Sequence, residues 1–494
     1  MIVATFFFLV PYQTNTHTHT PTFTQKKYTM ALASIIGLMG RGGPDSVIYD
    51  DPQSTSWRYV HMRHTNFAID NAAVTLQGTQ KTGANTVTNL PREGDLITSL
   101  YVVIDLPGLS SGTYVPRVGQ ALIERCQITL GSQCIDEITA EYLFMWDCLS
   151  GQSGKELREM IGHDPEAEYP ERHQRAQRLY VPIPFWFNSA CPGGVTGNAL
   201  PLISLQFHAV TIKLNLRSIV GLADSDATVA DNQGIDSIGR AWQPSSSTEY
   251  FAGSTPLSDD QTQVQLEVGY VYLDNEERSR FADSSMEVLV SQVQQMTKKR
   301  SSNATEQHRL YFNHPVKELI WGVRKAESAR EYLFDFSGRR IEKQAYDESG
   351  QPVLDDQGQP VTLTDDGDPV ISHILDPIST AQLKFNNHSR FNMAGGCSNS
   401  GGVPAPYFRT MTNYQSGHSR IPDIGRLEFV YCYPFALQPE SAQPSGTVNF
   451  SRIDNAILEL GYDNDGQEHE THVFALNWNL LAIKAGMGGL RYSN

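Results

Sequence analysis

The sequence VQLEVGYVYL at residues 264–273 runs directly into DNEERSRFA at residues 274–282. Apolar and polar side chains alternate in the first stretch, which is the period of a half-buried β-strand. In the second, Asp274 is followed three residues later by Glu277, the pattern of a helix N-cap with a capping box. A strand that ends in a short helix near the middle of a 494-residue chain predicts a connector between two domains.

Short β-type segments are expected before this connector. LITSLYVVIDL at residues 96–106 is closed by a Pro-Gly turn, and CQITL at residues 126–130 ends at a Gly-Ser hairpin signal. In TIKLNL at residues 211–216 every second side chain is apolar, so one face of that strand is predicted to be buried. YVPIPFWF at residues 180–187 carries Pro182 and Pro184, which predicts a strand at a sheet edge or a bulge, with an aromatic tail in the core.

The pattern of short β-type segments continues after the connector. Further strands are expected at residues 286–296, 310–313, 318–323, 381–385, 427–437, 457–460 and 473–481. Between them, residues 326–376 form a polar, acidic insertion with the near-repeats GQPV, GQPV and GDPV, which predicts consecutive turns in an exposed protrusion. Many short strands without a βαβ rhythm indicate two β-sandwich or barrel domains.

Composition limits the function. The chain carries a net charge of −16, which disfavours direct binding to nucleic acid. Its six cysteines form no C-x-x-C pair, and no histidine lies at zinc-finger spacing, so we expect mostly free, buried thiols and no metal site. GQSGK at residues 151–155 resembles a phosphate-binding loop, but Leu149 and Glu156 stand where that motif needs Gly and Ser or Thr. We therefore expect no catalytic residue, no cofactor and no enzyme activity.

The N-terminus needs a separate interpretation. MIVATFFFLV at residues 1–10 is apolar but too short to span a bilayer. Met30 opens a more sensible start, so residues 1–29 are interpreted as an extension or a misplaced start codon.

Six segments in series resemble the major capsid proteins of the nucleocytoplasmic large DNA viruses, the group that includes iridoviruses, phycodnaviruses and mimivirus relatives. They lie at residues 63–68, 180–187, 199–208, 272–282, 313–321 and 443–455, and together they span most of the chain between residues 55 and 460. The residues that carry the resemblance are Arg63, His64, Asn66, Phe67, Pro182, Pro184, Phe185, Trp186, Phe281, Asn313, Pro315, Trp321, Pro444, Gly446, Asn449, Arg452, Asp454 and Asn455.

The resemblance implies an all-β fold with two consecutive eight-stranded antiparallel jelly rolls, a short connector helix and long loops. The implied division is an inner-face segment at residues 30–54, a first jelly roll at 55–274, a connector at 275–285 and a second jelly roll at 286–494, in which the 326–376 insertion points outward. A homotrimer with a pseudo-hexagonal outline is implied. Its partners would be neighbouring capsomers, minor capsid proteins and the internal virion membrane, and assembly would take place in the host cytoplasm.

Two alternatives remain open beside a capsid subunit. A jelly roll can also serve as a glycan-binding or host-attachment virion protein, and a β-sandwich can carry an enzyme. Sequons at Asn303, Asn387 and Asn449 are candidate glycosylation sites, although chance sequons are ordinary in a chain of this length.

Overall fold

A computed structural model describes the chain from Asp50 to Tyr492 with gaps. The described residues are 50–53, 55, 57–59, 61, 63–109, 113–150, 157–162, 176–189, 191, 196–224, 251–252, 255–301, 303–325, 333–338, 340–342, 364–365, 368–369, 371–390, 402–420, 422, 428–462 and 468–492. The chain divides into two compact units between His64 and Thr65. All elements named below belong to the second unit. The predicted N-terminal extension and most of the 326–376 insertion lie outside the described residues.

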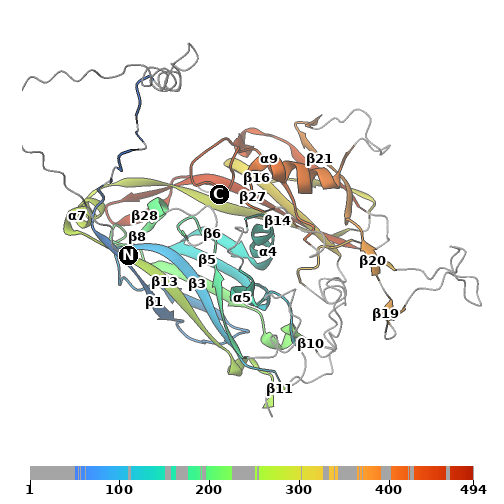
Figure 1. Ribbon diagram of the computed structural model, residues 1–494, viewed down its shortest axis with the longest axis horizontal. Helices are drawn as coiled ribbons and strands as arrows, with labels where there is room; N and C mark the ends of the chain where they lie inside the picture. Colours follow the sequence, from blue (N-terminus) through green and yellow to red (C-terminus); the bar gives the residue numbers. More distant parts are fainter. Residues whose placement is uncertain are drawn as a thin grey trace, which may run out of the picture. The chain divides into compact units, whose positions relative to one another are not determined.

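Eight strands in the first half of this unit form two antiparallel sheets (Figure 1). They are β1 (Phe67–Thr75), β2 (Asn85–Asn89), β3 (Leu96–Leu106), β5 (Ile123–Leu130), β6 (Gln133–Thr139), β7 (Gln177–Pro182), β9 (Val210–Leu216) and β13 (Gln263–Leu273). One sheet has the order β1-β13-β3-β7 and the other has the order β2-β9-β5-β6. We call this pair of sheets the first barrel.

Eight strands in the second half form another pair of antiparallel sheets, the second barrel. They are β14 (Met286–Ser301), β15 (Thr305–Arg309), β16 (Pro315–Lys325), β21 (Ile378–Phe385), β22 (His388–Ser389), β24 (Tyr431–Pro434), β26 (Ala456–Tyr462) and β27 (His469–Lys484). Their sheets have the orders β14-β27-β16-β24 and β15-β26-β21-β22.

The two barrels repeat one strand order. When the eight strands of each barrel are numbered along the chain, both barrels give one sheet 1-8-3-6 and another sheet 2-7-4-5. This is the eight-strand, two-sheet arrangement of a jelly roll. The predicted all-β double jelly roll is confirmed.

Burial follows the predicted alternation. On β9, Val210, Ile212, Leu214 and Leu216 are all buried while Lys213 is exposed, so the predicted face is the core face. The second core consists of apolar residues of the second barrel, such as those of β21 and β26.

The segment at residues 180–187, which contains Pro182 and Pro184, begins in a strand at the edge of a sheet. β7 ends at Pro182 and is the last strand in the order of its sheet. No strand of the described residues pairs with its outer side, so the N–H that proline lacks costs no hydrogen bond there. The aromatic tail that follows is buried at Phe185, Trp186 and Phe187. Both parts of the prediction for this segment are confirmed.

A helix follows the first barrel, as predicted. Helix α7 (Asn275–Asp283) begins after Asp274, whose carboxylate accepts the N–H of Asn275 at 2.8 Å. The strand predicted at residues 310–313 is wrong, because the strand there is β15 and it ends at Arg309.

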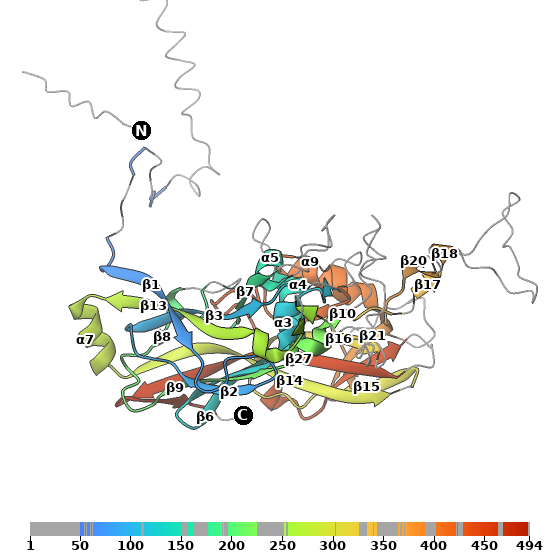
Figure 2. The same cartoon turned by 90° about the horizontal axis from the view of Figure 1, so that it is seen from below.

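The remaining elements are short and cap or border the barrels. The helical segments are α3 (Val118–Leu122), α4 (Ala140–Ser150), α5 (Arg158–Ile161), α9 (Thr412–Ser416), η3 (Thr196–Asn198), η4 (Ile219–Leu222), η5 (Asp259–Gln261), η6 (Tyr407–Met411) and η8 (Phe450–Arg452). The short strands are β4 (Thr113–Tyr114), β8 (Leu200–Pro201), β10 (Ala223–Asp224), β11 (Phe251–Ala252), β12 (Thr255–Pro256), β17 (Arg340–Glu342), β18 (Thr364–Asp365), β19 (Asp368–Pro369), β20 (Ile371–Ile374), β23 (Val403–Pro404), β25 (Val448–Asn449) and β28 (Met487–Leu490). Figure 2 shows α4, α5 and α9 gathered on one side of the strands. In the described part of the chain, no helix has the length and apolar character that crossing a membrane requires.

Candidate functional site at the interface between the barrels

Helix α4 of the first barrel packs against the second barrel. The ring of Phe144 stacks on the rings of Phe334 and Phe336, with centroids 5.0 and 5.3 Å apart. The ring of Tyr142 lies 5.4 Å from that of Phe474 on β27. These side chains belong to one buried apolar cluster with members from both barrels. The hydrophobic effect therefore holds the barrels together as it holds each barrel's own core.

A glycine on β16 permits this close approach. A Cβ atom at Gly322 would lie 2.5 Å from the Cε atom of Met145 on α4 and 3.0 Å from the ring of Phe336. A side chain at this position would force the Met145 methyl group and the Phe336 ring to shift, and a core at native packing density leaves them little room.

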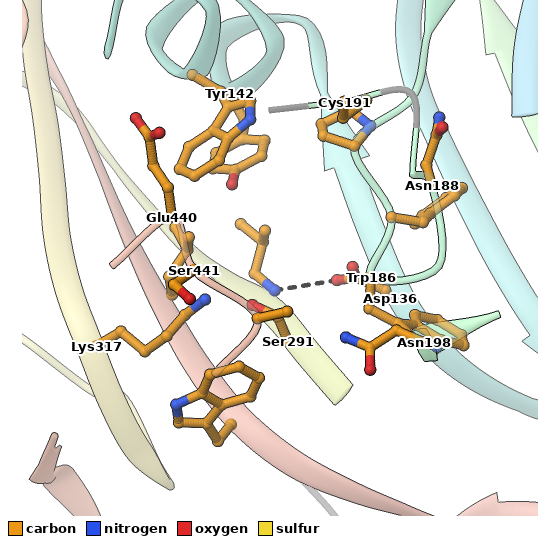
Figure 3. Close-up of a pocket in the computed structure, with 17 residues that line it drawn as sticks. Asp136, Tyr142, Trp186, Asn188, Cys191, Asn198, Ser291, Lys317, Glu440 and Ser441 are labelled. Carbon is orange, nitrogen blue, oxygen red and sulfur yellow. Dashed lines mark hydrogen bonds between the residues drawn. The ribbon is translucent and has the colours of Figure 1, made fainter. Parts of the chain in front are cut away.

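Polar contacts join the edge strands β6 and β14. The backbone N–H of Val293 donates to Oδ1 of Asp136 at 3.0 Å, the bond drawn dashed in Figure 3. The side-chain amide of Gln292 donates to the backbone carbonyl of Ile135. Strands at the edges of two different sheets are thus held to each other through side chains.

A buried ion network spans the same interface. Arg117 of the first barrel pairs with Asp147 and, at 3.0 Å, with Glu428 of the second. Arg420 pairs with the same Glu428 carboxylate at 2.7 Å. The side chain of Glu428 is 1% exposed and that of Arg117 is 4% exposed. Since each charge has a partner, the network resists separation of the barrels, and loss of one partner would leave a buried charge uncompensated.

A small cavity opens between the barrels (Figure 3). Its volume is about 60 Å³, and its walls include Asp136 and Trp186 of the first barrel with Lys317, Glu440 and Trp478 of the second. A volume of this size holds a few water molecules. The ammonium group of Lys317 lies 4.4 Å from the centre of the Trp478 ring, in a cation–π contact.

Three titratable groups that line the cavity have pKa values shifted from their ordinary values. Burial raises the pKa of Asp136 to about 8 and lowers the pKa of Lys317 to about 8. Burial also raises the pKa of the Cys191 thiol to about 12, so this group is not a thiolate near neutral pH. Such shifts can mark catalytic groups, but they also arise where structure alone buries a charge. A cavity too small for a substrate favours the structural explanation.

Comparison with known proteins identifies the family. A family described as large eukaryotic DNA virus major capsid protein matches residues 277–489, and one described as major capsid protein N-terminus matches residues 55–274. The major capsid protein of Pyramimonas orientalis virus is 30% identical to this chain, over 93% of this chain and 99% of its own length. The chain belongs to the major capsid protein family of large eukaryotic DNA viruses.

Solved structures agree with that membership. A chain in the quasi-atomic structure of the PBCV-1 virus capsid is 27% identical to this capsid protein, with a TM-score of 0.65 over 89% of this chain and 100% of the other. The Faustovirus major capsid protein is 12% identical and shares the fold, with a TM-score of 0.62 over 92% of this chain and 97% of its own. The protein is therefore a structural component of the virion that forms the capsid.

Several motif segments of this capsid protein lie next to one another. Phe67 on β1 pairs with Leu273 in the strand before the connector. Pro315 on β16 pairs with Asn449 on β25, and the N–H of His314 donates to the hydroxyl of Ser451 at 2.9 Å. The segments at residues 313–321 and 443–455 thus form one structural unit, although more than a hundred residues separate them.

The other motif residues are divided between core and surface. Trp186 and Trp321 are buried, Phe281 accepts a bond from Ser204 through its backbone carbonyl, and Asn455 bonds to Asn387. The motif residues that are exposed are Arg63, His64, Asn66, Phe67, Asn313, Pro444, Gly446, Asn449, Arg452 and Asp454. The structure does not bring the whole motif set together into a single site.

The three sequon asparagines are exposed, and hydrogen bonds are described for Asn449 and Asn387. Asn449 accepts the N–H of Ser451 at 3.0 Å and so caps a short helix. Asn387 lies in a left-handed turn with φ 66° and accepts a bond from Asn455. Glycosylation at Asn303, Asn387 or Asn449 stays a prediction, which the intact mass of virion-derived protein tests.

The cysteine prediction can be checked at five positions. Cys126, Cys148 and Cys432 are free and buried, Cys191 is free and partly buried, and Cys134 is free and exposed. Free thiols are confirmed at these positions, and Cys397 lies outside the described residues.

Proposed function

We propose that this capsid protein assembles as a homotrimer that forms a pseudo-hexagonal capsomer. Three chains with two like barrels each place six like barrels around a three-fold axis. The outline is then close to six-sided, and six-sided blocks tile the flat facets of an icosahedral shell.

The observation that carries this proposal is the repeated strand order. Both barrels have sheets ordered 1-8-3-6 and 2-7-4-5, so each chain supplies two similar building blocks. The apolar cluster shared by the barrels and the buried ion pairs between Arg117 and Glu428 support a fixed relation between these blocks. A capsomer of constant outline requires the two barrels of each chain to keep one orientation relative to each other.

The proposed capsomer contacts neighbouring capsomers through its sides, and minor capsid proteins and the internal virion membrane through its inner face. The segment at residues 31–43 is the candidate for the inner contact. The net charge of −16 supports a protein that does not bind nucleic acid directly. Assembly in the host cytoplasm belongs to the same proposal.

The insertion at residues 326–376 is proposed to extend outward from the capsomer. Within it, β17 pairs with β20, so the chain leaves and re-enters the barrel along one two-stranded ladder. An insertion with such a closed base can lengthen without moving the strands that carry it.

The proposal is tested by light scattering during size-exclusion chromatography of the full-length protein. The expected mass is three times the 55.0 kDa of one chain. A stable, folded monomer across micromolar concentrations contradicts the trimer. A monomer that also binds glycans would favour the host-attachment alternative instead.

A further inference from the structure

Three metal-binding side chains meet on one face of the second barrel. Glu318 lies on β16 and Cys432 on the neighbouring strand β24, while His418 follows α9. Ile320 is the cross-strand partner of Cys432, and Glu318 precedes Ile320 by two residues, so Glu318 and Cys432 share a face of the sheet. The carboxylate, imidazole and sulfur donor atoms all lie within 4.8 Å of one another.

The histidine lies between two carboxylates. His418 Nδ1 is 3.0 Å from Glu440 Oε1, and His418 Nε2 is 2.8 Å from Glu318 Oε2. The side chains of His418 and Glu318 are both 0% exposed. If Nδ1 donates its proton to Glu440, the lone pair of Nε2 faces an oxygen lone pair of Glu318. A cation must then lie between Nε2 and Oε2, and it is either a proton or a metal ion.

Two features of the cluster favour the metal ion. Oε1 of Glu318 is buried and has no hydrogen-bond partner among the described residues, an unfavourable state for a buried acceptor. The Cys432 sulfur provides a third donor atom beside the other two. A proton on His418 leaves Oε1 unpaired and leaves the Cys432 thiol as a donor to Asn413 Oδ1 at 2.5 Å. A metal ion can coordinate Oε1 and, once the thiol has lost its proton, the sulfur.

The donor set matches zinc. Thiolate, imidazole and carboxylate are the three ligand types that Zn²⁺ takes from proteins. The contact of Nδ1 with Glu440 matches the carboxylate–histidine–zinc arrangement, in which a second carboxylate orients the ligating ring. The charges of the Glu318 carboxylate and a Cys432 thiolate would together balance those of Zn²⁺.

We propose that Glu318, His418 and Cys432 bind one Zn²⁺ ion per chain, with Glu440 orienting the histidine. Zinc at about 2.1 Å from both Nε2 and Oε2 places these atoms about 3.4 Å apart in tetrahedral geometry. The present 2.8 Å contact therefore opens by about 0.6 Å on binding. Glu440 also lines the cavity of Figure 3.

The ion would tie together β16, β24 and the segment after α9, three parts of the second barrel that face the first. Three protein ligands leave the fourth position of a tetrahedral zinc ion to a water molecule. Glu318 and Cys432 are 114 residues apart, and neither forms a local Cys or His motif, which is why zinc-finger spacing in the sequence did not reveal the site.

The experiment uses full-length protein stripped of metal with a chelator and titrated with Co²⁺ as a spectroscopic probe. One Co²⁺ per chain is expected, with the near-ultraviolet charge-transfer band of a cobalt–thiolate bond, and Zn²⁺ is expected to displace it. Elemental analysis after dialysis against Zn²⁺ is expected to give one zinc per chain.

Three variants test the assignment. Cys432→Ser removes the thiolate band, whereas Cys126→Ser, a change at an equally buried thiol of the first barrel, leaves it intact. Glu440→Gln keeps all three ligands and weakens zinc binding about 10- to 100-fold, the usual effect of losing an orienting carboxylate. Circular dichroism confirms that each variant is folded, and the partly exposed Glu440 allows the test even if Cys432→Ser does not fold.

Two results overturn the proposal. One is a folded wild-type chain that binds no Co²⁺ or Zn²⁺, which assigns the cation beside His418 as a proton. The other is metal binding that neither Cys432→Ser nor Glu440→Gln changes, which places the ion elsewhere, for example at the exposed thiol of Cys134.

Discussion

Replacing Asp136 by Asn should make the stability of this capsid protein less sensitive to a rise in pH from acid to neutral. Asp136 lies on β6 at the interface between the barrels, where its Oδ1 atom accepts the N–H groups of Val293 and Glu137, each at 3.0 Å. Its Oδ2 atom is buried without a hydrogen-bond partner among the described residues. Asparagine retains the accepting oxygen and nearly the same shape, so Asp136→Asn removes the charge and little else.

The size of the effect follows from the pKa. Burial raises the pKa of Asp136 from 3.8 to about 8. Between these values the folded chain holds a proton that the unfolded chain has lost. Raising the pH therefore favours the unfolded chain, by about 1.4 kcal/mol per pH unit. Between about pH 5 and about pH 7 the free energy of unfolding contributed by Asp136 falls by about 2–3 kcal/mol, and in Asp136→Asn this loss is absent.

The measurement is urea unfolding of wild type and variant, followed by tryptophan fluorescence at several pH values. As the pH rises, the free energy of unfolding of the variant minus that of the wild type should increase. The other titrating groups are common to both proteins and cancel in this difference, so it reports on Asp136 alone. Asp260→Asn is the control, since Asp260 is exposed and pairs with Lys81 at the surface, where such pairs contribute below about 1 kcal/mol. A difference between wild type and Asp136→Asn that stays constant across the pH range would refute the reasoning.

Three further changes test the interface and the insertion. Phe144→Ala should lower the free energy of unfolding by about 3–5 kcal/mol in urea unfolding, because it empties the stack between the barrels, and a loss below 1 kcal/mol contradicts a shared core. Glu428→Gln should cost about 3 kcal/mol, because it removes the carboxylate partner of the partly buried Arg420 and leaves the buried Arg117 with Asp147 alone. Glu287→Gln in an exposed pair should cost less than about 1 kcal/mol, and equal losses would contradict the burial argument. Replacing residues 343–370 by Asn-Gly should leave the proposed trimer intact, because Glu342 and Ile371 are already paired and a two-residue turn can join them. Light scattering should give an unchanged mass and calorimetry an unchanged melting temperature. Dissociation of the trimer would place the insertion in the subunit contacts.

Sequence patterns could predict the strands whose two faces differ. β9 alternates between buried and partly or fully exposed residues, and β7 ends in a proline, which favours an edge strand. The connector helix was predictable because Asp274 provides a local start signal. Each of these signals arises within about ten residues of chain, and none required knowledge of a distant contact.

The interface between the barrels was not predictable, because its contacts join residues that lie far apart in the sequence. Helix α4 has the sequence AEYLFMWDCLS and is buried on nearly all sides, so its apolar residues show no helical period. β15 was missed because His308 is its one buried residue. The ion pair between Arg117 and Glu428 joins residues 311 positions apart, and the cluster of Glu318, His418 and Cys432 uses three separate segments. Only the folded chain brings such groups together.

Three groups of buried polar side chains lie where the barrels meet. They are the ion network around Glu428, the Asp136 carboxyl and the Glu318–His418 cluster. The hydrophobic effect itself has no direction, so apart from the fit of the side chains it does not favour one angle between the barrels over another. Paired charges and hydrogen bonds are directional, and a shifted register would leave them buried and unpaired. In a capsomer whose outline depends on the angle between its barrels, that directional penalty would select one angle over its neighbours.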